Sequence, residues 1–198
     1  MSSAALERLR EMLRQQGGLI ATLVDRASVA RADPDRETAP AAIVPSLGEA
    51  EDLDSPASLA AEGPLTEARS EEYELLVEAI YEGYLLHYGS PRVVRAPDAD
   101  LRLLAGDRLY AIGLARLVEL GDTSSVAELA DTITLSALAQ GAGEHQLADA
   151  IWLAGARAVG WGSSEAHRHA KRLVSAGAPE AIEAMRTSAS AAGTSLET

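Results

Sequence analysis

Apolar residues recur at helical spacing in two parts of the chain, residues 1–26 and 70–190. In the first part they line one face of a predicted amphipathic helix over residues 4–16, which Gly17 and Gly18 end. In the second part, short turn sequences separate six apolar segments, and we predict a helix for each. These helices cover residues 70–89, 98 or 100 to 120, 125–140, 144–159, 163 or 164 to 177, and 179 onward.

Polar residues mark where several of these helices are expected to begin. Ser70 precedes an acidic first turn, and Ser125 with Glu128 has the spacing of a capping box. Ser163 or Ser164 opens the helix that follows the "GWG" turn. No segment alternates between apolar and polar residues at period two, so we expect no strands. The predicted fold class is therefore all-α, an antiparallel helical bundle with short loops.

Residues 27–69 have a different composition. They contain most of the chain's prolines, acids outnumber bases, and the apolar residues follow no period. We interpret this stretch as an acidic, proline-rich, disordered linker; the alternative is that its segment "AAIVPSLGEAEDL" is a tethered motif that folds onto a partner. The expected organisation is an N-terminal helix in 1–26, the linker in 27–69, an all-α domain in 70–190 and a disordered tail in 191–198.

The composition narrows the function classes. The formal net charge is −13 and Lys171 is the only lysine, so the clustered basic residues that nucleic-acid binding needs are missing. Because the chain has no cysteine, disulfides, thiolate metal sites and a cysteine nucleophile are excluded. No apolar run reaches about 18 residues, so we expect no membrane span. The charged N-terminus lacks the apolar core of a secretory signal, and we expect a cytoplasmic protein.

Histidines are the most obvious candidates for chemistry. His167 and His169 are two residues apart on a predicted helix, so they point about 200° apart and cannot share a metal ion. Two pairs do have i,i+4 spacing, Glu165 with His169 and His145 with Asp149. Each pair suits a two-ligand metal site or, far more commonly, an ion pair on the surface.

Two further positions admit a chemical and an ordinary interpretation. His87 ends an apolar stripe, where it suits either catalysis or the capping of a last helical turn. Asp98 and Asp100 form a D-x-D that suits either Mg²⁺ with a diphosphate or a simple helix start. The chain has no Gly-rich phosphate loop and no G-x-S-x-G elbow. We therefore predict no catalytic residue, no metal and no cofactor.

The predicted helix "LRLLAGDRLYAIGLARLVELGD" carries glycines in its interior. Each interior glycine costs a helix roughly 1 kcal/mol relative to alanine, so Gly106 and Gly113 need a compensating contact. They are one heptad apart and share a face, which we call the small-residue face, with Asp107 at its rim. Such a face allows another helix to approach closely.

This segment resembles a helix of the trans-polyprenyl diphosphate synthases that reads roughly L-A-G-D-Y-L-x-A-x-x-L, followed by a V-x-x-L-A-x-x-I helix. The matching residues are Leu104, Ala105, Gly106, Asp107, Leu109, Ala111 and Leu114, then Val126, Leu129, Ala130 and Ile133. The preceding "VEAIYEGYLLHYGSP" is similar to the family's VELIH-x-x-x-LIHDD helix. There the matching residues are Val77, Glu78, Ile80, Leu85, Leu86 and His87.

The resemblance covers residues 72–140 and implies part of the isoprenoid synthase fold. Catalytic members bind Mg²⁺ and the allylic diphosphate through two aspartate-rich motifs. Where the first motif is expected to begin, this chain has "HYGS", and no second D-D-x-x-D follows. Arg92 and Arg95 fall near the family's diphosphate-binding arginines. The chain thus resembles the non-catalytic small subunit of two-component, heptaprenyl-type diphosphate synthases, a subunit similar to a truncated synthase.

This resemblance implies a partner rather than an enzyme. The expected function is to bind or stabilise a catalytic polyprenyl diphosphate synthase subunit through the 101–120 and 125–140 helices, or to self-associate through them. In the family these helices lie at the subunit interface, so the small-residue face is expected to receive the partner's helix. The alternative is a general all-α interaction or scaffold protein unrelated to isoprenoids. The expected interface residues are Leu103, Gly106, Asp107, Tyr110, Gly113, Leu114 and Leu117.

Overall fold

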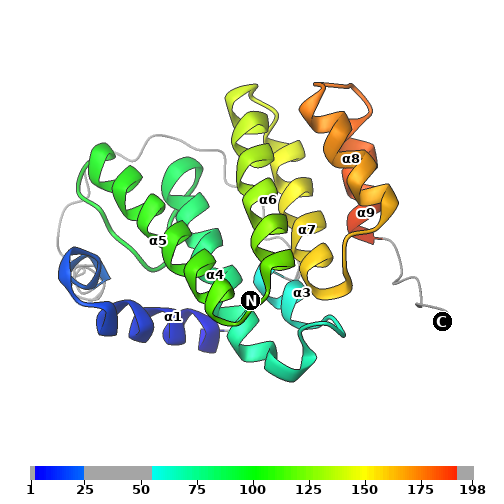
Figure 1. Ribbon diagram of the computed structural model, residues 1–198. Helices are drawn as coiled ribbons and strands as arrows, with labels where there is room; N and C mark the ends of the chain where they lie inside the picture. The colour runs from blue at the N-terminus through cyan, green and yellow to red at the C-terminus, as the bar shows by residue number, and fades with distance from the viewer. Residues whose placement is uncertain (1–2, 25–54, 191–198) are drawn as a thin grey trace.

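The computed structural model describes residues 3–24 and 55–190, and within these ranges every regular element is helical (Figure 1). The elements are α1 (Ser3–Gln16), α3 (Pro56–Ala61), a short 3-10 helix η1 (Glu67–Arg69), α4 (Ser70–Tyr88), α5 (Ala99–Glu119), α6 (Thr123–Gly141), α7 (His145–Trp161), α8 (Glu165–Ser175) and α9 (Ala181–Ser190). Residues 18–24 are also helical. The all-α prediction is confirmed for the part of the chain described.

The long helices pack side by side in pairs; residues 89–98 form the loop between α4 and α5, and short turns join the later helices (Figure 1). α4 packs along α5, α6 along α7, and the α8–α9 hairpin covers the far side of α7. A central core lies between α4 and α7, with Trp152 buried in the middle of it. The aromatic rings of Tyr81 and Tyr84 lie 5.0 and 5.1 Å from the Trp152 ring, so α4 and α7 are joined largely by aromatic contacts.

The N-terminal helix lies across the end of the α4–α5 pair, as Figure 1 shows. On the apolar face predicted for it, Leu9 and Leu13 are fully buried, and Leu6 and Met12 are half-buried beside them. The segment 18–24 adds Leu23 to the same cluster, and the Leu23 carbonyl accepts a hydrogen bond from the backbone N–H of Arg95. The amphipathic pattern of the first 26 residues therefore serves packing within the chain.

Residues 55–69, which the composition placed in the linker, contain α3 and η1 joined by a turn, and α3 packs against the rest of the fold. Ser55 caps α3 by accepting from the Ser58 N–H, and the helix buries Ala57 and Ala60 against α4 and α7. The Thr66 hydroxyl, also buried, donates to the Ala60 carbonyl. Small residues pack here without a stripe of large apolar side chains, so hydrophobic periodicity did not reveal the helix. The remaining linker residues to position 54, with the "AAIVPSLGEAEDL" motif, and the 191–198 tail lie outside the described residues.

Helix starts agree with the sequence in part. Ser164 and Asp98 cap α8 and α5 as expected, each accepting from a backbone N–H three residues on. Ser70 does not act as a cap, because η1 runs directly into α4. The Ser125–Glu128 capping box is also wrong: Asp122 caps α6.

Candidate functional site

The small-residue face of α5 is filled by α4 of the same chain. A Cβ atom on Gly106 would lie 2.5 Å from the His87 ring and 3.0 Å from the Gly83 carbonyl oxygen. A Cβ atom on Gly113 would lie 2.4 Å from the Ile80 side chain. These separations are below ordinary van der Waals contact, so the glycines are what allow the two helices to approach. The expectation that this face receives a helix from another subunit is therefore corrected.

The predicted interface residues divide between the two sides of α5. Leu117 is fully buried together with both glycines, Leu114 is half-buried, and Tyr110 is half-buried with its ring stacked on His87 at 5.3 Å. Leu103 and Asp107 are exposed. The structure therefore does not bring the seven residues together on one free surface.

A different face of α5 is free. Leu104, Ala111 and Val118 are spaced seven residues apart and are all exposed, with Leu103 and Ala115 exposed beside them. We call these five residues the outer face of α5. Leu104 is 63% exposed and Val118 is 56% exposed, which is high for large apolar side chains on a well-packed helix. The exposed Asp107 and Arg108 lie among these apolar positions, so the outer face is interrupted by charge.

The histidine pairs proposed from spacing do not form sites. The Glu165 carboxylate pairs with Arg168 and Arg172 instead of His169, and the ring of His145 hydrogen-bonds Gln140 at 2.7 Å. Burial raises the pKa of the nearby Asp149 carboxyl, and the charge of His145 offsets part of that rise. Among the described residues, no group of three or more His, Asp or Glu side chains is placed to hold a metal ion.

Beneath the last turn of α4, the Nε2 atom of His87 is buried and lies 3.2 Å from an Asp107 carboxylate oxygen. The two atoms do not form a hydrogen bond, so the contact is electrostatic. Asp98 serves as the α5 cap and Asp100 is exposed in the first turn. The D-x-D pair therefore has its ordinary role at a helix start.

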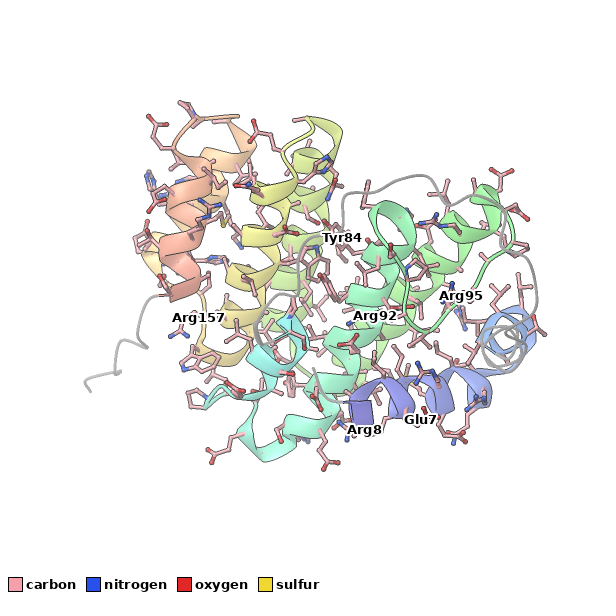
Figure 2. All side chains as sticks on the ribbon, turned by 180° about the vertical axis from the view of Figure 1, so that it is seen from behind. Glu7, Arg8, Tyr84, Arg92, Arg95 and Arg157 are labelled. Atoms are coloured by element: carbon pink, nitrogen blue, oxygen red, sulfur yellow. The ribbon has the colours of Figure 1, made fainter. Side chains whose placement is uncertain are left out.

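Arg92, which is labelled in Figure 2, is held by two buried carboxylates. Its guanidinium pairs with Glu78 and lies 3.4 Å from Glu82, and it also covers the Tyr81 ring. The fully buried Glu82 carboxylate accepts hydrogen bonds from the backbone N–H groups of residues 92, 93 and 94. This network fixes the loop between α4 and α5, and it engages the arginine that the resemblance placed near a diphosphate.

A buried polar network that joins three helices was missed from the sequence. His167 on α8 is buried, with Nε2 2.7 Å from Glu128 on α6 and Nδ1 2.7 Å from the hydroxyl of Ser188 on α9. Lys171 donates to Glu128 at 3.0 Å and to Asp131 at 2.7 Å. We call His167, Glu128, Ser188 and Lys171 the His167 network. The i,i+4 spacing of His167 and Lys171 was the available signal, because it places both on one face of α8.

Burial of Glu128 raises its pKa, but the hydrogen bonds and charges of His167 and Lys171 outweigh that effect, so the pKa is lowered. Serine, histidine and glutamate in contact resemble a nucleophilic triad in composition. Ser188, however, is buried inside α9, where backbone N–H groups are used by the helix and form no oxyanion hole. The arrangement is that of a clamp that ties the α8–α9 hairpin to α6.

These observations define an all-α protein with an apolar outer face on α5 and a buried polar clamp between α6, α8 and α9. No protein-family model matches the chain, and no curated protein or solved structure is significantly similar to it. Within residues 3–24 and 55–190, no helix combines the length and the apolar character needed to cross a membrane.

Gly106→Ala tests whether the small-residue face is an internal contact. We expect a loss of stability of about 1–3 kcal/mol, because the new methyl overlaps the His87 ring and nears the Gly83 carbonyl. Thermal unfolding followed by circular dichroism at two protein concentrations tenfold apart measures it. An internal contact lowers Tm equally at both, whereas a contact between subunits gives a concentration-dependent loss. Gly141→Ala, which meets open space, is the control.

Glu128→Gln tests the His167 network through pH. Because the folded pKa of Glu128 is lowered, its carboxylate stabilises the fold above the unfolded pKa of about 4.3, and this is lost as pH falls through the folded pKa. We expect the variant to be about 1–3 kcal/mol less stable at pH 7 and the difference to shrink toward pH 3. Urea unfolding across pH 3–7 measures this. A difference independent of pH contradicts the assignment, and the exposed Glu119→Gln serves as control.

Proposed function

We propose that the protein is a non-catalytic partner subunit that binds another protein through the outer face of α5. The observation that carries this proposal is the exposure of Leu103, Leu104 and Val118 on one well-packed helix. Burying such side chains contributes roughly 25 cal/mol per Å² of apolar surface, so a partner helix laid along α5 gains contact energy there. The exposed Ala111 and Ala115 between the larger side chains allow that helix to lie close.

We further propose that this partner is the catalytic subunit of a polyprenyl diphosphate synthase. The support is the resemblance over residues 72–140, whose first two helices are direct neighbours in this fold, as α4 and α5. The glycines of the "AGD" helix serve the contact between those neighbours, so docking falls to the opposite side of α5. The position where the family's first acidic motif begins carries His87, which packs against Gly106 instead of facing an open cleft.

The alternative is a general helical interaction or scaffold protein with more than one contact surface. Leu138 at the end of α6 is 55% exposed and borders an apolar cleft of about 440 Å³. Leu147, Val174 and Ile182 from α7, α8 and α9 line the same cleft. A second apolar surface far from α5 suits a scaffold better than a subunit with a single partner.

To test the proposal, this chain is co-expressed without a tag together with a tagged catalytic synthase subunit of the same organism. The tagged subunit is then affinity-purified, and the amount of this chain that co-purifies is measured. We expect a stable complex, and at least a tenfold weaker one for Leu104→Asp or Val118→Asp, because a charge is placed in the apolar contact. Leu138→Asp is the matched control, since Leu138 is equally exposed on a different surface.

Each outcome of this experiment decides between the alternatives. No complex with the synthase subunit rejects the proposed partner. A complex weakened by Leu138→Asp and not by Leu104→Asp rejects the outer face of α5 as the docking surface and favours the scaffold. Sedimentation of the purified chain alone tests self-association, and dissociation by Leu104→Asp identifies a second copy as the occupant of the outer face.

A further inference from the structure

A cleft of about 310 Å³ opens between the start of α6, the end of α7 and the turn that follows α3. This volume is at the lower end of the range for small-molecule sites. One wall is apolar and consists of Leu65, Ala158 and Val159. The rest is polar and consists of Asp122, Ser124, Ser125, Glu128, Gly162 and Ser163.

The polar wall presents hydrogen-bond acceptors. The Ser124 hydroxyl donates its hydrogen to Asp122 at 2.8 Å, and the Ser125 hydroxyl donates to the other Asp122 oxygen at 2.6 Å. A serine hydroxyl has one hydrogen, and in both serines Asp122 already accepts it. The hydroxyl oxygens of Ser124 and Ser125 therefore offer only lone pairs to a ligand. Each Glu128 oxygen accepts one hydrogen bond, from His167 or Lys171, and keeps further acceptor capacity.

The charge of the cleft is negative. Glu128 is buried, and its pKa is lowered by His167 and Lys171 against the opposing effect of burial. Burial also opposes the ionisation of Asp122, but hydrogen bonds from Ser125 and Tyr73 lower its pKa to about 2. Both groups are therefore ionised at neutral pH, and no basic side chain is among the residues that line the cleft. The start of α6 does not attract an anion, because Asp122 already caps the Ser125 N–H.

We propose that this cleft binds a small ligand with a protonated primary amine on a short apolar chain. An ammonium group has three N–H donors and no acceptor, which complements a wall of hydroxyl lone pairs and carboxylates. The apolar chain lies against Leu65, Ala158 and Val159. The source of the amine is either a free alkylamine or the lysine side chain of a peptide, since both present the same group. The inference is independent of the partner proposed for α5.

Titration of the full-length ¹⁵N-labelled protein with butylamine, followed by NMR, tests the proposal. We expect saturable shifts of the backbone amides of Gly162 and Ser163, at least tenfold weaker binding of 1-butanol, and no binding of butyrate. N-acetyl-lysine methylamide distinguishes the sources: binding at least as tight as that of butylamine favours a lysine side chain. Equal binding of butanol, binding of butyrate, or shifts spread away from the cleft overturns the proposal.

Substitutions at the rim provide a second measurement. Leu65→Lys places a tethered ammonium beside the cleft, so we expect at least a tenfold loss of butylamine affinity, whereas Leu65→Met retains the apolar wall and the affinity. Leu138→Lys adds the same charge on a distant surface and leaves binding unchanged. Ser124→Ala removes one acceptor on an exposed residue, with an expected loss of about threefold. Unchanged binding in both Leu65→Lys and Ser124→Ala overturns the proposal.

Discussion

The close approach of α4 and α5 is the contact on which the rest of the structure depends. At Gly106 and Gly113 of α5 there is no room for a Cβ atom, because α4 fills that space with the His87 ring, the Gly83 carbonyl and the Ile80 side chain. The cost of glycine in a helix is offset by the packing that this approach permits, because dispersion contacts accumulate only at short range. α1 and the 18–24 segment pack against one end of this helix pair. The aromatic core that it shares with α7 lies toward the other end.

Two buried polar networks hold further segments in place, one beside α4 and the other beside α6. Glu82 binds three successive backbone N–H groups of the loop before α5, and Glu128 binds His167 and Lys171 of the outer hairpin. A buried carboxylate is tolerated only when its lone pairs are used, so each network specifies one arrangement of a segment that apolar packing alone would leave less defined. Acids that a charge count assigns to solvent thus have structural roles.

The functional consequence is that α5 has two different sides. Its inner side packs against α4 of the same chain, whereas its outer face, with Leu104 and Val118, is exposed in the described part of the protein. On that outer face, large apolar side chains lie toward both ends, with alanines and the charged Asp107 and Arg108 between them. The polar cleft beside Glu128 has the opposite character, since it is concave, negative and rich in acceptors. The two surfaces lie on different elements and differ in chemistry.

The sequence by itself determined the helical class, the long helices of the 70–190 region and the caps at Asp98 and Ser164, because periodicity and capping are local properties. It marked Gly106 and Gly113 as a close contact without showing whose helix fills it. Only the tertiary structure decided that α4 does so, that residues 56–61 form a helix packed against α4 and α7, and that Glu128 contacts His167. Those outcomes depend on residues 20 to 100 positions apart being brought together, and no local spacing encodes which of several compatible faces will meet.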